Sequence, residues 1–495
     1  MSASRRTLLA GGTAGLGLAV AGAVPSLAEA SPAGRHQGRP GPGTPAGRPG
    51  TTLFPPLQDD PDGILALPEG FEYAIVTTAG VTTLDGGAGL TPSNHDGMAV
   101  FGAGRGRYAL VQNHEIGGGE GIPVPHVQGT VYDPGAPAGG CTVITTDPRG
   151  RNHGEAVALS GTVQNCAGGP TPWGTWLTCE ETEVRAGTAW PEDEEDGNGT
   201  SGVYEKDHGY VFEVRADGSA DPRPITCLGR FAHEALAIDK TRTQVFLSED
   251  ADGPNGLFYR WTAPRGVRLG ADMMADLADD AGTLEAMQIR LPDGSVLPDV
   301  AYLTSAQLGR EFPVTWVEVP DRDARETSTR EQLADGEVTR GRKFEGVWGT
   351  DAGVYVVNSY AWEEGDMPAD AVPHNGMVWF YDYAKRTIAL VTYFPHQRTT
   401  ETEGPAKYDD LTFDSPDNVT VTPWGSLVLA EDGVGASHVL SATPYGPTQA
   451  IARNMLNDSE FCGPVFSPDG AVLFVNMQDP GYTLAITGPW EKYLR

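Results

Sequence analysis

The sequence of 495 residues lacks the short motifs that identify several common catalytic sites. It has no G-x-x-x-x-G-K-[ST] loop, which excludes the usual phosphate cradle of nucleotide-binding proteins. It has no G-x-S-x-G turn, which excludes the nucleophile elbow of α/β-hydrolases. His114-Glu115 and His233-Glu234 each begin an H-E-x-x-H pattern, but the second histidine is missing in both, so that type of zinc protease is excluded.

Positive charge is also scarce in this chain. It has 34 Lys and Arg residues against 66 Asp and Glu residues, and its net charge is −32. The phosphates of a nucleic acid would repel such a protein, so nucleic acid is excluded as a partner. The acidity suits a soluble exported protein, and it also suits a protein that binds cations.

Cysteine is rare, and no C-x-x-C pair occurs among the five cysteines, so a structural zinc site is not expected. Cys179 stands directly before Glu180 and Glu181, at the end of a predicted strand. A buried cysteine is usually a small apolar side chain, but beside two carboxylates a thiolate metal ligand is an equal alternative. The residues alone leave both open.

Long apolar runs are confined to the N-terminus. Arg5-Arg6 precedes a Gly- and Ala-rich stretch and then Ala28-Glu29-Ala30, which together predict a twin-arginine signal peptide over residues 1–30. We therefore expect the export machinery of that route as a partner, and a periplasmic or extracellular location. No later segment has 18 consecutive apolar residues, so no membrane span is predicted.

The rest of the chain is divided by composition. Residues 31–62 are rich in Pro and Gly and are predicted to form a disordered linker. Residues 63–495 are predicted to form the catalytic domain, and we expect it to be a monomer.

Six segments of this domain share one design. Each opens with an acidic or amide residue, continues through a short apolar run with Gly, and ends a β-rich run on another acidic or amide residue. The segments span residues 96–115, 165–181, 234–250, 345–358, 417–432 and 460–476. Two short strands repeated about six times indicate a propeller. The predicted fold is therefore all-β, a six-bladed β-propeller with loop and helical insertions. One insertion spans residues 263–340 and contains a helix-like run at residues 271–278.

The repeated acids predict a metal site. Equivalent strand ends of a propeller converge on its axis, and convergent carboxylates repel one another unless a cation lies between them. Acids at strand ends also suit tight turns, which explains any single position better than it explains all six. Oxygen donors favour calcium, and one thiolate among them favours iron.

Several runs carry a resemblance to a known family. They are residues 112–115, 171–181, 231–234, 343–346, 416–418, 430–433 and 459–464, of which Trp173-Gly174-Thr175-Trp176-Leu177-Thr178-Cys179-Glu180-Glu181 is the most specific. In these runs, and in family order over residues 65–480, the chain resembles the PhoX-type alkaline phosphatases. The resemblance implies a six-bladed propeller that hydrolyses small phosphomonoesters with an axial pair of iron ions and several calcium ions.

The resemblance also implies roles for individual residues. Cys179 would bind iron, and Glu115, Glu180, Glu234, Glu345 and Asp432 would bind iron or calcium, with Asn418 as a weaker ligand. Asn113 would contact substrate. Where the family has a phosphate-binding arginine two residues before the glutamate, this chain has Lys343, and Arg342 beside it is the other candidate. Lys343, Arg342 and Glu345 are thus the predicted catalytic residues.

Two other functions remain open at this point. One is a propeller that binds calcium without catalysing a reaction. The other is a propeller lactonase or esterase with a single calcium ion. A thiolate ligand would favour the phosphatase, because a lone calcium site has no use for sulfur.

Overall fold

The chain is almost entirely β-structure in its computed structural model, which describes residues 52–190, 199–219, 221–362, 371–396, 410 and 412–495. The only α-helix in this described part is α1, the five residues Trp490–Leu494. No helix there is long and apolar enough to cross a membrane. The predicted signal peptide and most of the predicted linker lie outside the described residues.

The strands form antiparallel sheets that mostly follow the chain order. The first joins β4 (His95–Gly104), β5 (Arg107–His114), β6 (Gly139–Thr146) and β7 (Asn152–Thr162). The second joins β8 (Asn165–Pro170), β9 (Thr175–Glu180) and β12 (Val211–Arg215). A small sheet joins β10 (Ala189–Trp190) to β11 (Gly202–Val203).

A nine-stranded sheet follows. Its order is β13 (His233–Ile238), β14 (Gln244–Glu249), β15 (Phe258–Thr262), β16 (Thr283–Ile289), β17 (Glu311–Glu318), β21 (Thr387–Pro395), β20 (His374–Asp382), β19 (Gly353–Asn358) and β18 (Phe344–Gly349). β17 pairs with both β16 and β21, so it links two groups of four strands.

The last two sheets contain the chain ends. One has the order β1 (Leu57–Gln58), β2 (Leu65–Pro68), β25 (Thr448–Asn454), β24 (His438–Ala442), β23 (Leu427–Glu431) and β22 (Pro416–Val421). The other has the order β26 (Phe461–Phe466), β27 (Val472–Met477), β28 (Tyr482–Thr487) and β3 (Glu72–Thr78).

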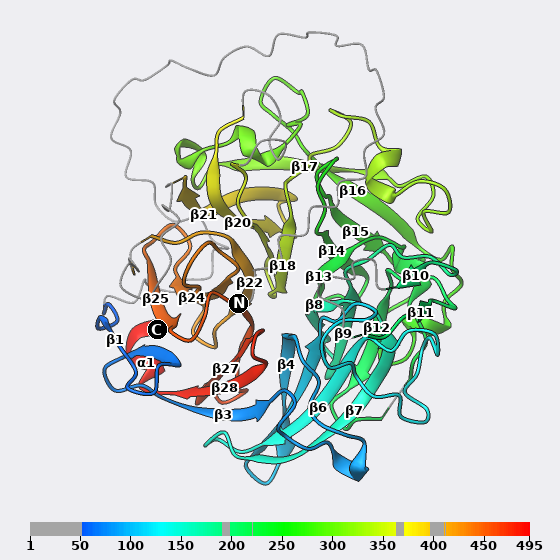
Figure 1. The fold of residues 1–495 in the computed structure, drawn as a ribbon. Coiled ribbons are helices and arrows are strands. Elements are labelled where there is room, and N and C mark those ends of the chain that lie inside the picture. Colours follow the sequence, from blue (N-terminus) through cyan, green and yellow to red (C-terminus); the bar gives the residue numbers. More distant parts are fainter. Residues whose placement is uncertain (1–51, 191–198, 220, 363–370, 397–409, 411) are drawn as a thin grey trace. The chain divides into compact units, whose positions relative to one another are not determined.

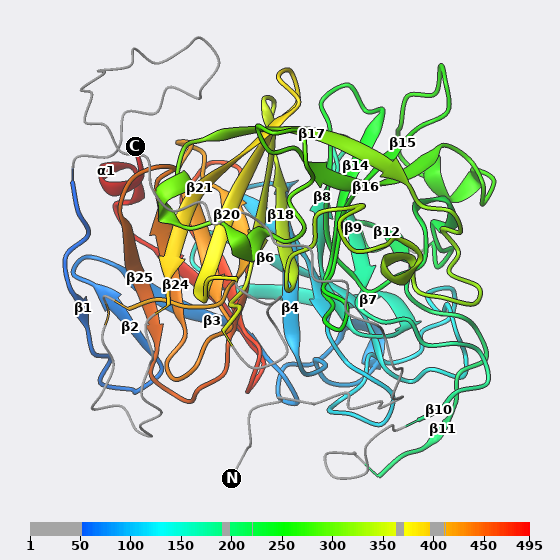
Figure 2. The same ribbon diagram turned by 90° about the horizontal axis from the view of Figure 1, so that it is seen from above.

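The sheets surround a common centre, as in a propeller (Figure 1). The strands nearest the centre, which we call the inner strands, are β4, β8, β13, β18, β22 and β26. Each contacts the next in this order, and β26 contacts β4, which closes the ring. Viewed from above, β4 and β18 run along the same general direction (Figure 2). The arrangement of sheets is therefore propeller-like, as the repeated sequence design predicts.

The ring is closed by strands from the two chain ends. β3 precedes β4 in the chain but pairs with β28 along its whole length. Upstream of it, the Phe54 ring stacks on Tyr493 of α1 at 4.7 Å between centroids, and β1 pairs with β2. Packing thus begins before residue 63, where the sequence placed the start of the domain.

The insertion between β15 and β18 corrects one prediction. Residues 263–340 contain no α-helix; they supply strands β16 and β17 and short 3₁₀ turns at Met274–Asp276, Val300–Tyr302, Ser305–Gln307 and Thr329–Gln332. The helix-like run at 271–278 is interrupted because Asp272 has a φ of 60°, in the left-handed region.

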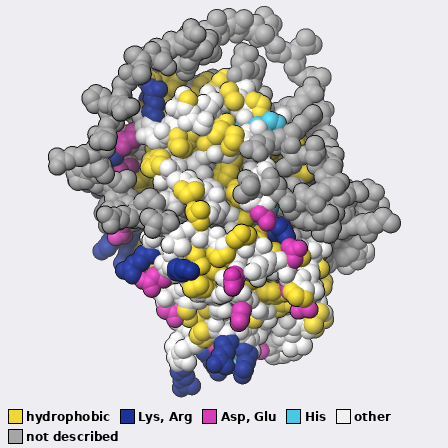
Figure 3. All heavy atoms as spheres, turned by 90° about the vertical axis from the view of Figure 1, so that its left-hand side faces the viewer, with side chains coloured by type: hydrophobic (Ala, Val, Ile, Leu, Met, Phe, Trp, Pro, Cys, Tyr) yellow, Lys and Arg dark blue, Asp and Glu magenta, His cyan; other side chains and the backbone are white. Residues whose placement is uncertain are grey.

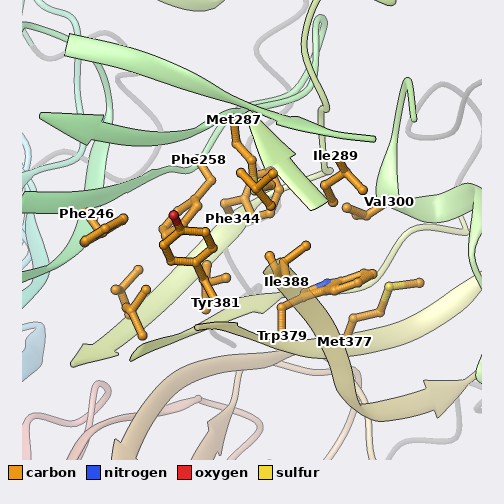
Figure 4. Packing of buried hydrophobic residues seen from close by; sticks show 14 of the residues in the cluster. Phe246, Phe258, Met287, Ile289, Val300, Phe344, Met377, Trp379, Tyr381 and Ile388 are labelled. Atoms are coloured by element: carbon orange, nitrogen blue, oxygen red, sulfur yellow. The ribbon is translucent and has the colours of Figure 1, made fainter. Parts of the chain in front are cut away.

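Apolar side chains interdigitate between the two halves of the nine-stranded sheet. Phe258 of β15 lies 6.1 Å from Phe344 of β18, and Phe246 of β14 lies 5.4 Å from Tyr381 of β20, between ring centroids. Figure 4 shows these rings with Trp379 in the same buried cluster. Such packing fixes β13 and β18, two inner strands, relative to each other.

Glycines allow the inner strands to approach closely. A Cβ atom on Gly97 of β4 would lie 2.6 Å from Ala167 Cα of β8. A Cβ atom on Gly346 of β18 would lie 2.7 Å from the backbone oxygen of Asp417 in β22. Both neighbouring atoms belong to backbone, so they cannot move aside as a flexible side chain would. Gly97 and Gly346 are thus packing requirements of the ring.

We expect Gly97→Ala to destabilise the protein by about 1–3 kcal/mol, because the new methyl group overlaps the β8 backbone. Gly102→Ala in the same strand is the matched control, since a Cβ there meets nothing within 4 Å. Chemical denaturation of both variants checks this. Equal stabilities of the two variants would contradict it.

Candidate metal and phosphate site

Each inner strand carries an irregularity near its start. The pairing register with the second strand of the sheet shifts between two residues of each inner strand: His95 and Met98, Asn165 and Gly168, His233 and Leu236, Phe344 and Val347, Pro416 and Val419, and Cys462 and Val465. An extra residue in one strand breaks the alternation of side chains between the two faces and redirects one of them.

The residue directly after the first paired residue of an inner strand has a carboxylate or thiol side chain. In five inner strands this residue is Asp96, Cys166, Glu234, Glu345 or Asp417. Ligand atoms of Cys166, Glu181 and Glu234 all lie within 4.8 Å of one another, and so do those of Glu234, Glu345 and Asp417. We call the convergent residues Asp96, Glu115, Cys166, Glu181, Glu234, Asp250, Glu345, Asp417, Asp432 and Glu460 the axial cluster.

The backbone before four of these strands is strained. Asn94, Gln164, Lys343 and Ser415 each directly precede the first residue of an inner strand, and their φ angles are 41–48°. Residues other than glycine adopt such angles at a cost that the surrounding structure must outweigh, and they concentrate at functional sites. The positive φ angle recurs at four equivalent positions, which indicates that the bulge of each of these strands depends on it.

The second strands contribute acids from the residue just beyond their ends. Glu181 follows β9, Asp250 follows β14 and Asp432 follows β23. Successive side chains of a strand point to opposite sides, so the acids that end these strands face away from the axis. Those strand-ending acids are Glu180, Glu249 and Glu431.

Glu180 is held by backbone and by a buried histidine. Its carboxylate accepts hydrogen bonds from the backbone N–H of Val163, Gly209 and Tyr210 at 2.9–3.1 Å. His208 Nδ1 lies 2.6 Å from Glu180 Oε1, and His208 Nε2 lies 3.1 Å from Asp133 Oδ2. Burial lowers the pKa of His208, but the two carboxylates outweigh it and raise the pKa to about 9.

The same arrangement of carboxylate, cation and carboxylate recurs twice. His438 bridges Glu431 at 2.8 Å and Asp410 at 3.1 Å. Arg330 Nη1 bridges Glu249 at 3.1 Å and Glu183 at 2.7 Å. We call these three arrangements clamps; each fixes the end of a second strand one residue before a member of the axial cluster.

Burial and repulsion together dominate the electrostatics of the cluster. Burial and then neighbouring carboxylates hold the pKa values of Asp96, Glu234, Asp417 and Glu460 well above their usual range. Burial and the nearby Asp250 raise the pKa of Glu345 to about 8. Without cations, burial and repulsion thus favour the protonated forms of these groups.

Lys343 is the cation closest to this charge. Its Nζ lies 2.6 Å from Asp250 Oδ2, and 31% of its side chain is accessible, so it can also meet a ligand. Burial lowers the pKa of Lys343, but Asp250 and Glu345 outweigh it, so the ammonium form is favoured. Arg342 is held differently: its guanidinium lies 4.3 Å from the centre of the Tyr360 ring and donates to the Tyr360 backbone oxygen at 3.3 Å.

The donor set fits metal cations. Among the described residues, the buried atoms Asp96 Oδ1 and Glu234 Oε1 have no hydrogen-bond partner, and the Cys166 thiol donates to Glu234 Oε2. Buried carboxylate oxygens are costly when unsatisfied, and a cation removes this cost together with the mutual repulsion. The group offers many oxygens and one thiol, which suits hard cations with a softer ion at Cys166.

The structure places four of the predicted metal ligands, Glu115, Glu234, Glu345 and Asp432, in the axial cluster. Glu115 accepts a hydrogen bond from Gln478 at 2.7 Å, and its charge raises the pKa of Asp96. Asp432 lies on the exposed rim, and its charge raises the pKa of Glu345 and Asp417.

Cys179 and Glu180 are placed elsewhere. Cys179 is fully buried in a hydrophobic cluster with Leu177, Val211 and Phe231. Glu180 is held by the His208 clamp. Their counterparts in the cluster are Cys166 and Glu181, so the thiol and the carboxylate assigned from the sequence are both corrected.

The two predicted amides also have supporting positions. Asn113 donates to the backbone oxygens of Cys166 and Ala167 at 3.0 and 2.8 Å and accepts from Trp176, so it holds the Cys166 bulge and has no capacity left for substrate. Asn418 donates to Asp417 at 2.8 Å and accepts from the Gly463 backbone. It positions Asp417, which occupies the cluster in its place.

The family resemblance gave no role to the other members of the cluster: Asp96, Cys166, Glu181, Asp250, Asp417 and Glu460. A signal existed for most of them, because each follows a residue that ends or begins a strand in the repeated segments. The missing information was the bulge, which shifts the inward-facing position by one residue.

Comparison with known proteins agrees with this geometry. The family model for alkaline phosphatase PhoX matches residues 52–154 and 136–481. The chain belongs to the PhoX family. Membership makes it a phosphoric monoester hydrolase by class and confirms the resemblance found in the sequence. No curated protein sequence matches the chain.

A solved PhoX structure has a similar fold. Pseudomonas fluorescens PhoX in complex with vanadate, a transition state analogue, matches with a TM-score of 0.58 and 19% identity, over 88% of this chain and 97% of that one. At this identity the likeness establishes the fold alone. The holo form of the PQQ domain of pyranose dehydrogenase from Coprinopsis cinerea matches 86% of this chain and 97% of its own at 12% identity, but its TM-score of 0.35 carries no argument.

The His208 clamp predicts a pH dependence of stability. The folded protein keeps the His208 proton up to about pH 9, whereas the unfolded chain loses it near pH 6.5. The stabilisation is therefore complete below about pH 6.5 and is lost as the pH rises through 9. We expect His208→Gln to lower the unfolding free energy at pH 6 by about 1–3 kcal/mol and much less above pH 9.

Denaturation of metal-loaded protein at several pH values measures this difference. His438→Gln, in the equivalent clamp, should behave in the same way, since burial is again outweighed by Glu431 and Asp410 and its pKa rises to about 9. A pH-independent loss in both variants would contradict the expectation.

Proposed function

We propose that this PhoX-family phosphatase is an exported, metal-dependent phosphomonoesterase whose active site is the axial cluster. The observation that carries the proposal is the convergence of buried carboxylates and one thiol beside Lys343. Without a cationic ligand there, the repulsion would destabilise the protein and serve no function. Small phosphomonoesters are the proposed substrates, as the family name indicates.

The proposed architecture has six blades. Six inner strands in a ring of contacts support it, and so do six register shifts at equivalent positions. Each inner strand would then begin one blade and supply its bulge residue to the common axis. In this arrangement the nine-stranded sheet comprises two blades joined by β17.

The proposed metals are a pair of iron ions and several calcium ions. Cys166, Glu181 and Glu234 would hold iron, because they combine a thiol with two carboxylates within 4.8 Å. Glu345, Asp417 and the remaining acids would complete the iron sites and hold calcium. When bound, such ions supply Lewis-acid charge beside a phosphate group.

The chain's own cations would hold the substrate phosphate. Lys343 stays protonated and partly accessible beside the cluster, so its ammonium can donate to a phosphate oxygen and stabilise the charge that develops there. Asp250 fixes the position of this ammonium through their ion pair. Arg342, the neighbouring residue, is oriented by Tyr360 and supplies further positive charge at the same strand start. Glu345 acts as a ligand on the same strand.

Export by the twin-arginine route, a periplasmic or extracellular location and a monomeric state are proposed on the sequence alone. Arg5-Arg6 and the Ala28-Glu29-Ala30 cleavage signal support the first two. These residues lie outside those that the structure describes.

We expect purified mature protein to release phosphate from p-nitrophenyl phosphate and to lose this activity when a calcium chelator is added. Cys166→Ser should lower kcat/KM by on the order of 100-fold and remove bound iron, measured by elemental analysis. Cys179→Ser is the matched control, because its thiol lies in the hydrophobic core; it should retain iron and most activity.

The outcomes separate the rival functions. Calcium without iron and without phosphate release would favour a binding propeller, and turnover of lactones alone would favour a lactonase. Loss of iron in Cys179→Ser but not in Cys166→Ser would overturn the ligand assignment.

We further expect Lys343→Met to lower kcat/KM by on the order of 100-fold, because the phosphate loses its nearest protein cation. Lys343→Arg keeps the charge and should lose less. Steady-state kinetics with p-nitrophenyl phosphate measure both, and metal content shows whether the site is still loaded. Unchanged kcat/KM in Lys343→Met would exclude a role in phosphate binding.

A further inference from the structure

A cavity of about 380 Å³ lies at the opposite ends of three inner strands from the axial cluster. Pro170 ends β8, Ile238 ends β13 and Gly349 ends β18, and all three line it. Each stands four residues beyond a cluster member of its own strand, which corresponds to roughly 13 Å along an extended chain. The cavity is therefore separate from the proposed catalytic site.

Three cations converge on this cavity: Lys240, Arg242 and Arg268. None of the three forms an ion pair with a carboxylate among the described residues, although Asp351 also lines the cavity. The chain as a whole carries a net charge of −32. On the face shown in Figure 3, by contrast, Lys and Arg side chains are interspersed with Asp and Glu. Three cations and one acid line the cavity, so its potential is positive and attracts anions.

The loops that carry these cations are held in place. The Asp239 carboxylate accepts hydrogen bonds from the backbone N–H of Thr241, Thr243 and Gln244 at 2.8–3.0 Å, which fixes the β13–β14 turn. Arg242 sits in this turn with a φ of 60°. The Leu269 N–H donates to the Arg242 backbone oxygen at 2.8 Å, so the loop that bears Arg268 is tied to the same turn.

Apolar residues form much of the rest of the cavity wall. Pro170, Pro172 and Ile238 line it, together with Thr171 and Thr350. Concave sites that combine an apolar wall with a few convergent polar groups are typical of small-molecule binding. The combination suits an organic anion with a compact doubly charged group, and the volume exceeds what an inorganic ion alone would fill.

We propose that this cavity is a second anion site, which binds a small phosphate ester or phosphonate with its charged group at Lys240, Arg242 and Arg268. The apolar part of the ligand lies against Pro170 and Pro172. The site works without the metal ions of the axial cluster, and it catalyses nothing. It goes beyond the proposed function and does not depend on it.

The test uses metal-loaded protein and phenylphosphonate, which has no phosphate ester bond to hydrolyse. Equilibrium dialysis should find two bound molecules per wild-type chain, one in each site. The triple variant Lys240→Gln, Arg242→Gln, Arg268→Gln should bind one molecule, at the axial cluster. The affinity of its cavity for phenylphosphonate should be weakened at least about tenfold. It should keep wild-type turnover of p-nitrophenyl phosphate.

A control variant removes the same charge elsewhere. Arg105, Arg107 and Arg149 are exposed and lie outside the cavity, and their replacement by Gln should leave two bound molecules. Lys343→Met should lose only the molecule at the axial cluster. If the proposed function is wrong and the axial cluster binds no phosphonate, the molecule in the cavity should still be found.

Inorganic phosphate tests the apolar wall, because it carries the charge without the phenyl group. We expect it to compete for the cavity more weakly than phenylphosphonate. One bound phenylphosphonate per wild-type chain, lost in Lys343→Met and kept in the cavity variant, would overturn the proposal. An equal loss in the cavity variant and the control variant would also overturn it, since the effect would then be one of net charge.

Discussion

Mutual repulsion of buried carboxylates is the constraint on which the rest of this structure depends. Ten acidic or thiol side chains converge on the axial cluster, and burial with neighbouring charge raises the pKa of most of them. Lys343 brings its ammonium into direct contact with one of the acids, Asp250. The fold therefore holds together, at one point, groups that would separate in a flexible chain.

Three features oppose this tendency. Bulges with strained residues before them direct the side chains of the inner strands to the axis, and glycines such as Gly97 and Gly346 let those strands approach. The clamps at His208, Arg330 and His438 fix the ends of the second strands from the other side. The cluster is thus arranged by backbone and by neighbouring ion pairs before any ligand arrives, which is the preorganisation that phosphoryl transfer requires.

Much of this could be predicted from single residues, but not all. Glu234 and Glu345 were identified because they open repeated segments, and both lie in the cluster. Cys179 and Glu180 were chosen over Cys166 and Glu181 because the resemblance placed the family's iron-binding cysteine in the most specific run of the sequence. A shift of one residue along a strand decides whether a side chain faces the core or the axis. A bulge causes such a shift, and the residue pattern does not reveal it. The helix expected near residue 271 failed for a similar local reason, the left-handed φ of Asp272.

The sequence by itself determined the all-β class, the repeated two-strand unit, the acidic character and the resemblance to the PhoX family, because these depend on composition and on periodic patterns. The tertiary structure decided which side of each strand end faces the axis, which thiol joins the carboxylates, and that Lys240, Arg242 and Arg268 meet at one cavity. Those outcomes depend on register and on contacts between residues far apart in the chain, and local sequence does not encode either one on its own.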